Sequence, residues 1–429
     1  MCTTEESVRA SSSVAEHYNA VPNTGIADRT QSRIFYLRNF NNWVKSQLIG
    51  DVIGRIGDEW PEGATGRDTV HIFDLCCGKG GDILKWRKAD EHPAFRRRQL
   101  TVGRVVFSDI ADVSLEQCKS RYEQTKSRAK FERHPREMFA AEFVHGDATE
   151  EELSCKFQSS EQQFDLTSQQ FSLHYGFETE AKARRMLQNA CARLRPGGYY
   201  VATVPHSARL IALLRSQSHD QAIFQNEVCR LELLRRQIIT EHAQPRLFGE
   251  KYEFRLHEQV DCPEYLLHFP LLQKLLEEFD MELVWCKSFD EIMMEKGGFT
   301  GEGRGLLGRM QALESYPPES DVQLMSTAKK EYEHAEKKWR EMHEHGKDAP
   351  RPHQKLGVLS HSEWQVACLY LAFVFRRRNE ETNEQPATCA KTAIQPAVKQ
   401  AKPDRNNSEQ ETCQAKSDPE NQSDQRDHQ

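Results

Sequence analysis

The clearest pattern of apolar and polar positions lies near the start of the chain. Between residues 33 and 56, apolar side chains recur every three or four positions, and polar side chains fill the positions between them. This spacing puts the apolar side chains on one face, so we expect an amphipathic helix. Its apolar residues are Ile34, Leu37, Phe40, Val44, Leu48 and Val52.

Short apolar runs alternate with further helical patterns after this helix. We expect helices at residues 82–88, 113–130 and 180–194. We expect strands at residues 70–75, 105–110 and 141–147, within 163–175, and at 197–204. Because strands that alternate with helices form parallel sheets, the predicted fold class is α/β, a doubly wound, mostly parallel sheet with helices on both faces.

The later part of the chain is predicted to complete this sheet. The apolar stretches 281–289 and 364–377 are expected to be closing strands, and a helix at 263–279 leads to the first of them. The charged segment 326–347 is expected to be a helix with a solvated face.

The two ends of the chain differ in composition from the part between them. Residues 379–429 contain no Phe, Trp or Tyr, and ten acidic and six basic residues give this tail a charge of −4. Such a segment buries too little apolar surface to offset the entropy lost on ordering. We therefore expect disorder at 1–13 and 379–429, and one folded domain at 14–378.

The overall composition narrows the class of protein. Apolar residues make up 38% of the 429 residues, enough for a sizeable core. No run of 18 apolar residues occurs, so no membrane contact is expected. The start lacks the basic-then-apolar order of a secretory signal, which favours an intracellular protein. Of the net charge of −7, only −3 remains without the tail, which leaves room for a local basic groove.

The segment FDLCCGKGGD allows two interpretations: a metal or redox site, or a loop that cradles a small molecule. The twelve cysteines of the chain show no C-x2-C spacing, and Cys76 and Cys77 point in different directions if the segment is extended. We therefore expect reduced thiols and no metal. Gly78, Gly80 and Gly81 let the backbone approach a ligand closely, because they carry no Cβ.

Acidic residues mark the ends of three successive predicted strands. Asp74 closes the first strand, Asp109 ends the second and Asp147 ends the third. The glycine loop matches neither a P-loop nor the full dinucleotide fingerprint. An acid at the end of the second strand typically binds ribose hydroxyls. Three such carboxylates suit a ligand with a ribose, a base and a positive group, and S-adenosylmethionine has all three.

Several motifs together resemble the eukaryotic mRNA cap guanine-N7 methyltransferases. RNFNNWVK and QFSLHY are the most specific of them, whereas the glycine loop and the Pro-Gly-Gly turn occur in many methyltransferases. The other resembling stretches are VAEHYN, CGKGGDILKW, SDIADVSLEQCKSRY, RLRPGGYYVATVPHS, FGEKYEF, MQALESYPP and LSHSEWQVACLYLAFVF. The resemblance implies the class I S-adenosylmethionine-dependent methyltransferase fold, with S-adenosylmethionine as methyl donor.

The resemblance and the glycine loop together imply roles for individual residues. The predicted donor-binding residues are Lys45, Asp74, Cys76, Gly78, Asp109, Asp147, Gln170 and Tyr175. The predicted cap and RNA contacts are Asn41, Asn42, Lys79, Lys85, Arg121 and Phe171. The predicted catalytic group around the guanine is Glu264, His174 and Tyr370.

The chain departs from the family pattern at Cys76, where the family usually has glycine. If this position needs a positive φ or a close approach, the added Cβ and sulfur should weaken donor binding. The stretch 88–104 also looks longer than usual, and His206 stands where the family has asparagine.

The reaction itself predicts what kind of site to expect. Guanine N7 has a lone pair and no proton, so it can attack a methyl sulfonium in line without a general base. The rate must then come from positioning, helped by acids that favour the positive charge developing on the guanine. Glu264 is the best candidate for this role, and His174 is expected to be a hydrogen-bonding wall residue.

Two other functions stay open at this point. One is a methyltransferase for another RNA or a small molecule, and the other is an RNA-binding relative that lost donor binding at Cys76. The resemblance implies the capped 5′ end of mRNA as partner and the nucleus as location. It also implies contacts with an activating subunit, a capping enzyme or RNA polymerase II.

Overall fold

The computed structural model describes residues 14–20, 29–61, 69–133, 135–217, 222–241, 243–298, 300–344 and 355–379. Within these ranges no helix combines the length and the apolar character needed to cross a membrane. The segments predicted to be disordered, 1–13 and 379–429, lie outside the described residues, apart from Asn379.

A seven-stranded sheet forms the centre of the fold, with the strand order β10-β13-β5-β4-β1-β2-β3. The pairs among β1 to β5 are parallel, whereas β13 is antiparallel to both β5 and β10. This confirms the predicted doubly wound, mostly parallel sheet. The strands are β1 (Thr69–Leu75), β2 (Thr101–Asp109), β3 (Ala140–His145), β4 (Phe164–Gln170), β5 (Leu194–Pro205), β10 (Met281–Ser288) and β13 (Tyr370–Arg377).

The strand order reverses beside β1, because β2 and β3 follow on one side and β4 and β5 on the other. The connections that leave the carboxyl ends of β1 and β4 therefore run to opposite faces, and a crevice opens between them. The glycine loop follows β1 at this point.

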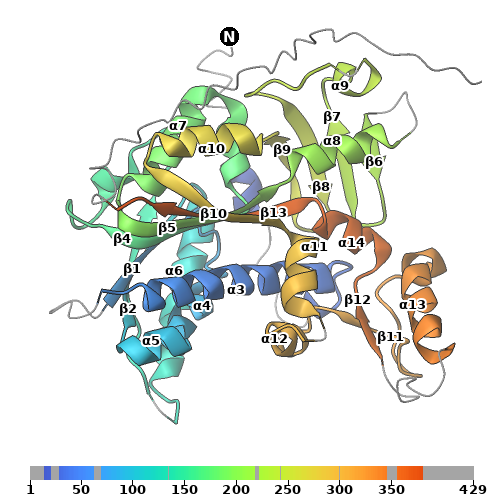
Figure 1. The fold of residues 1–429 in the computed structure, drawn as a ribbon, viewed down its shortest axis with the longest axis horizontal. Coiled ribbons are helices and arrows are strands. Elements are labelled where there is room, and N and C mark those ends of the chain that lie inside the picture. Colours follow the sequence, from blue (N-terminus) through green and yellow to red (C-terminus); the bar gives the residue numbers. More distant parts are fainter. Residues whose placement is uncertain are drawn as a thin grey trace, which may run out of the picture. The chain divides into compact units, whose positions relative to one another are not determined.

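Helices cover both faces of the sheet (Figure 1). Adjacent strand residues point to opposite faces, and in β2 Phe107 packs into one hydrophobic cluster while Val106 packs into the other. One face carries α3 (Phe35–Asp58), α4 (Ile83–Ala89), α5 (Pro93–Arg98) and α6 (Asp112–Ala129), and the other carries α7 (Glu180–Cys191) and α10 (Phe269–Glu277).

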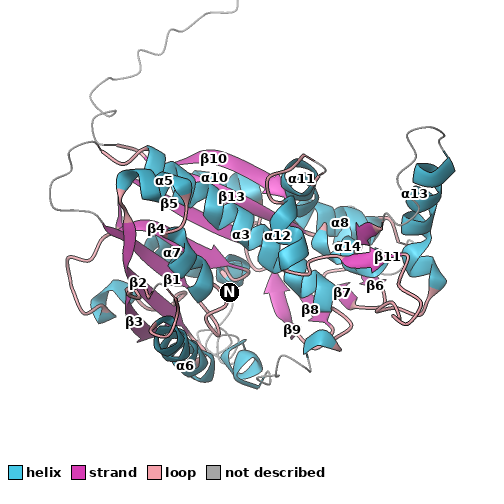
Figure 2. Ribbon diagram, turned by 90° about the horizontal axis from the view of Figure 1, so that it is seen from below, coloured by secondary structure: helices cyan, strands magenta, loops and turns pink. Residues whose placement is uncertain are grey.

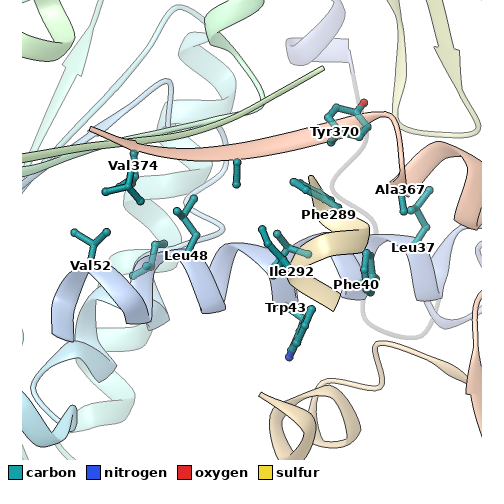
Figure 3. Close-up of a cluster of buried hydrophobic side chains, with 14 of the residues drawn as sticks. Leu37, Phe40, Trp43, Leu48, Val52, Phe289, Ile292, Ala367, Tyr370 and Val374 are labelled. Atoms are coloured by element: carbon teal, nitrogen blue, oxygen red, sulfur yellow. The ribbon is translucent and has the colours of Figure 1, made fainter. Parts of the chain in front are cut away.

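The predicted amphipathic helix is α3, and its apolar stripe is buried. Phe40 and Val44 are fully inaccessible to solvent. Figure 3 shows the stripe facing β13, α11 (Phe289–Ile292) and α14 (His361–Ala367). This packing fixes the rotation of α3 about its axis and turns its polar positions toward the crevice.

A four-stranded antiparallel sheet, which was not predicted, lies beside the central sheet (Figure 2). Its burial alternates along β7 and β8 as expected for strands with one solvated face. The alternating signal was therefore present in the sequence. The strands are β6 (Ile223–Gln225), β7 (Cys229–Leu233), β8 (Lys251–Leu256) and β9 (Val260–Tyr265).

Two predicted elements in the later part are wrong in their bounds. The helix expected at 263–279 begins only at Phe269, where Pro270 fits the first turn, because the preceding residues belong to β9. The strand expected at 364–377 begins only at Tyr370. Ser360 and Glu363 form a capping box that starts α14 instead. An apolar run alone does not distinguish the two structures.

The charged segment 326–347 is only partly one α-helix. A 3-10 turn, η4 (Lys329–Tyr332), precedes α13 (Glu333–Glu344). The remaining elements are η1 (Leu153–Lys156), η2 (Leu173–Glu178), α8 (Ser207–Arg215), α9 (Gln237–Thr240), the π-turn η3 (Met293–Gly297), α12 (Arg304–Arg309), β11 (Glu314–Tyr316) and β12 (Leu356–Val358).

Candidate active site

A cavity of about 710 Å³ opens at the carboxyl ends of the central strands. Among the residues predicted for the site, only Lys85 does not line it. Those that do are Asn41, Asn42, Lys45, Asp74, Cys76, Gly78, Lys79, Asp109, Arg121, Asp147, Gln170, Phe171, His174, Tyr175, Glu264 and Tyr370.

The glycine loop forms the floor of this cavity. Gly78 has a φ of 53°, and a Cβ built on it would meet no atom within 4 Å. The space above Gly78 is therefore open to a ligand. Gly80 also has a positive φ, of 71°, but the space beside it is filled. A Cβ there would lie 2.7 Å from the sulfur of Cys118. Gly80 thus serves the packing of the loop on α6.

The two cysteines of the loop point in different directions. The Cys77 sulfur lies 4.0 Å from the Cys118 sulfur on α6, whereas the Cys76 sulfur accepts a long hydrogen bond of 4.0 Å from Gln169 Nε2. Cys76 has a φ of 58°. This is the left-handed region that favours glycine. From the sequence we expect Cys76 to weaken donor binding if its φ is positive, and this condition is met. Among the described residues no His, Cys, Asp or Glu cluster suits a metal ion.

Two strand-end acids face the open side of the loop. Asp109 accepts hydrogen bonds from the Gly78 N–H at 2.7 Å and the Ala111 N–H at 2.9 Å, and Asp147 accepts two from Thr149. Burial raises the pKa of Asp109, and its backbone hydrogen bonds act against this rise. Each carboxylate has more lone pairs than these bonds use, so both can accept further hydrogen bonds.

Asp74 lies deeper than the other strand-end acids. Its side chain is buried and accepts a hydrogen bond of 2.8 Å from the Trp86 indole. Burial, and then the nearby Asp82, raise the pKa of Asp74 to about 7. The cavity wall at Asp74 therefore carries less negative charge than an ordinary aspartate would.

Asp82 is a site residue that the sequence reasoning missed. It binds the Lys45 ammonium group at 2.9 Å and the Lys85 ammonium group at 2.8 Å. Burial would raise the pKa of Asp82, but the two lysines outweigh it and lower the pKa well below the usual range. Lys85 also donates a short hydrogen bond to Asn42. The sequence feature that could have identified Asp82 is its position directly after the glycine loop, at the start of α4.

Glu264 and His174 form a buried pair in the cavity wall. Glu264 Oε2 accepts a hydrogen bond of 2.6 Å from the Tyr252 hydroxyl, and Glu264 Oε1 lies 3.4 Å from His174 Nε2. Neither ring nitrogen of His174 makes a hydrogen bond to a described residue, and the same holds for Asn41 Oδ1. Buried polar atoms without partners are rare, so these atoms are suited to a polar ligand.

Aromatic side chains complete the wall. Phe171 has a φ of 59° at the end of β4, and its ring meets the Tyr370 ring edge to face at 5.2 Å between centroids. The Tyr175 hydroxyl lies 3.0 Å from the Tyr18 hydroxyl and 3.3 Å from the Cys262 sulfur. Tyr18 was missed, although its stretch VAEHYN carried part of the resemblance.

Gln170 belongs to a polar network at the end of β4. Its Nε2 donates to Ser168 at 2.9 Å, and its Oε1 accepts from Thr203 at 3.2 Å. This network holds the amide at the cavity edge.

Several cations gather at the rim of the cavity. Burial lowers the pKa of Lys79, and the positive charges of Arg29, Arg121 and Arg38 lower it further. The three arginines therefore lie close enough to Lys79 to repel it, and all four side chains line the cavity, which makes this part of it suited to an anion.

The chain is similar to known proteins along most of its length. The family model of the mRNA (guanine-N(7))-methyltransferase domain matches residues 1–378. The mRNA cap guanine-N(7) methyltransferase of Caenorhabditis elegans is 40% identical over 382 residues, 88% of this chain and 91% of that protein. The Drosophila melanogaster protein of the same name is 36% identical over 378 residues, 87% and 79% of the two chains. Among solved structures, loganic acid methyltransferase with SAH matches with a TM-score of 0.40 and 12% identity, over 82% of this chain and 98% of that one.

Proposed function

The chain belongs to the mRNA (guanine-N7)-methyltransferase family, and from this premise we propose that it transfers a methyl group from S-adenosylmethionine to N7 of the guanosine cap of mRNA. The observation that carries the proposal is the cavity, which is lined both by predicted donor residues and by predicted guanine residues. A cap bound there would meet the donor directly.

The donor half of the cavity fits S-adenosylmethionine. When bound, this molecule supplies a methyl group on a positively charged sulfur. The open space above Gly78 admits a ligand close to the backbone. We expect Asp109 to accept the ribose hydroxyls, and backbone N–H groups hold both its oxygens in position. Asp147 is the corresponding acceptor near the adenine.

The guanine half of the cavity offers a carboxylate and unpartnered polar atoms. We expect Glu264 Oε1 to accept hydrogen bonds from guanine N1–H and N2–H, while Tyr252 holds the other carboxylate oxygen. His174 and the amide oxygen of Asn41 gain partners when a polar base enters. The rings of Phe171 and Tyr370 limit where the base can lie.

Methyl transfer to N7 requires these side chains only to position the reactants and to supply charge. Because guanine N7 has no proton to lose, none of them needs to act as a base. Holding N7 in line with the methyl carbon supplies most of the rate enhancement. The negative charge of Glu264 favours the positive charge that develops on the guanine.

The direct test is methyl transfer by the purified protein to an unmethylated cap dinucleotide. We expect methylation at N7, and Asp109→Ala should lose donor binding in isothermal titration while it retains cap binding. Asp58→Ala is the matched control, since Asp58 lies at the exposed end of α3 and pairs with Arg97 on the surface. Normal donor affinity in Asp109→Ala would refute this map of the donor site.

The same assay separates the alternatives. A protein that binds capped RNA but no labelled S-adenosylmethionine would be the non-enzymatic relative. One that methylates uncapped RNA would have another substrate. By analogy with the family we place the protein in the nucleus, where caps are made. Binding assays with an activating subunit, a capping enzyme and RNA polymerase II test the other expected partners.

A further inference from the structure

Helix α3 carries a polar stripe along the wall of the cavity. Arg38, Asn42 and Lys45 are spaced at intervals of four and three residues, which puts them on one face of the helix. All three line the cavity. The stripe runs from the predicted donor side at Lys45 toward the beginning of α3 at Arg38.

The two cations of this stripe differ in whether an acidic side chain balances their charge. Lys45 is paired with Asp82, and Asp82 also holds Lys85. The Arg38 guanidinium makes no ion pair or hydrogen bond with any residue in the described ranges, although the side chain is only partly exposed. The negative charge of Glu258 raises the pKa of Arg38, and Glu258 also accepts a hydrogen bond from Ser32.

The surroundings of Arg38 add to its uncompensated positive charge. Burial lowers the pKa of Arg38, and the charge of Arg29 lowers it further, while Glu258 acts weakly in the opposite direction. The pKa of Arg121 is lowered by the same two causes. A half-buried cation that is repelled by others is stabilised when an anion enters.

On the basis of the proposed function, we propose that Arg38 binds a phosphodiester group of the RNA chain just downstream of the cap triphosphate. The cations predicted for the triphosphate, Lys79, Lys85 and Arg121, come from the β1–α4 segment and α6, whereas Arg38 comes from α3. The planar guanidinium presents two parallel N–H donors, which match a phosphate.

The distances along α3 favour a downstream phosphate. Lys85 is bonded to Asn42, and Arg38 lies four residues before Asn42, which corresponds to about 6 Å along the helix axis. Asn42 and Arg38 both line the cavity, so an RNA chain that passes Asn42 in this direction reaches Arg38 within one or two nucleotides, since successive phosphates of one strand advance by about 3.4 Å in a stacked helix.

Space for the RNA continues beyond this point. Gln311 lines the cavity and also a second hollow of about 600 Å³. Gln311 is tied to α3 through its carbonyl oxygen, which accepts a hydrogen bond of 3.0 Å from Asn39. The second hollow includes Tyr36 and Lys355 in its wall. An aromatic ring and a cation suit a single-stranded nucleic acid.

The test compares two substrates that share the cap but differ in length: a cap dinucleotide and a capped oligoribonucleotide. Arg38→Ala should raise KM for the capped oligoribonucleotide by about tenfold, the effect of removing one charge-assisted hydrogen bond. Its KM for the dinucleotide should stay near that of the unmodified protein. Lys79→Ala should raise both. Lys274→Ala, an exposed lysine on α10, is the control and should change neither.

Salt dependence gives a second readout that a structural role would not move. Removing one phosphate-binding cation should lower the slope of log K against log salt concentration for single-stranded RNA by about 0.7. Arg38→Lys keeps the charge and should keep the slope. Arg38→Gln repeats the neutral substitution with a longer side chain, and thermal unfolding checks that each variant is folded.

The outcomes separate this proposal from the proposed function. Equal increases in KM for both substrates, or an unchanged salt slope in Arg38→Ala and Arg38→Gln, would overturn the role of Arg38 and leave the function standing. If the unmodified protein methylates neither substrate, the proposed function fails first, and the role of Arg38 in it fails with it.

Discussion

At the scale of single residues, backbone conformation distinguishes the glycines and cysteines of the loop after β1. Gly78, Gly80 and Cys76 all have a positive φ. Gly78 borders open space and Gly80 packs against Cys118, whereas Cys76 adopts this conformation although it carries a side chain. For an L-residue this conformation costs about 1 kcal/mol or more. Cys76 therefore combines backbone strain with a side chain at the cavity.

The first prediction concerns this position. Cys76→Gly should raise donor affinity, because the Cβ and the sulfur leave the cavity wall, and it should relieve about 1 kcal/mol of backbone strain. Isothermal titration with the donor and urea unfolding measure the two effects. Cys77→Gly is the matched control and should lower stability by about 0.5–1 kcal/mol without improving affinity. Equal or lower donor affinity in Cys76→Gly would mean that the loop is adapted to sulfur.

The second prediction concerns Asp74. Its pKa is about 7 in the folded protein and about 4 in an unfolded chain. Between these values the folded state binds a proton that the unfolded state has lost, so this group's contribution to stability falls as the pH rises from about 4 to 7. In Asp74→Asn, which still accepts from Trp86, the free energy of unfolding should decrease less steeply over this window. Urea unfolding at several pH values measures the slope, and an unchanged slope would contradict the shift.

At the scale of elements, α3 connects the core to the site. Its apolar stripe packs under β13 and beside α11 (Figure 3), while its opposite positions carry Asn42 and Lys45 into the cavity. Loosening this packing should therefore affect both stability and ligand binding.

Phe40→Ala tests the packing of α3. Phe40 is fully buried and stacks on Trp43 with centroids 5.7 Å apart, so its truncation should lower the free energy of unfolding by about 3–5 kcal/mol. Phe131→Ala removes the same atoms from a side chain that is 89% exposed and should change stability by less than about 0.5 kcal/mol. Similar effects of the two substitutions in chemical unfolding would contradict the described packing.

At the scale of the whole molecule, charge is divided unevenly along the chain. The tail from Asn379 onward contributes −4 to a net charge of −7, while cations gather at the cavity rim. Attraction of RNA depends on this distribution rather than on the net value.

A chain that ends at Arg378 should retain methyl transfer and the midpoint of thermal unfolding. Without the acidic tail, it should bind capped RNA slightly more tightly at low salt, and the difference should disappear when salt screens the charges. Methylation assays and RNA titrations at two salt concentrations measure both effects. Loss of activity on truncation would show that the tail contributes to the site.

The sequence by itself determined the helices and strands that have a regular apolar pattern. The 3.6-residue spacing of α3 and the apolar runs of β1 to β5 are local patterns, and a local pattern is visible without the fold. The strand-end acids could be predicted in the same way, because parallel strands bring their carboxyl ends to one edge. Motif resemblance added residues such as Glu264 and Tyr370 that no local pattern identifies.

Only the tertiary structure decided which of these groups meet. The pairing of Asp82 with Lys45 and Lys85, the contact of Tyr18 with Tyr175 and the antiparallel sheet of β6 to β9 depend on segments far apart in sequence. The same holds for the boundary between α14 and β13, where a capping box overrode an apolar run. Side chains that are distant in sequence acquire their charge, burial and partners from packing, and packing is a property of the folded chain as a whole.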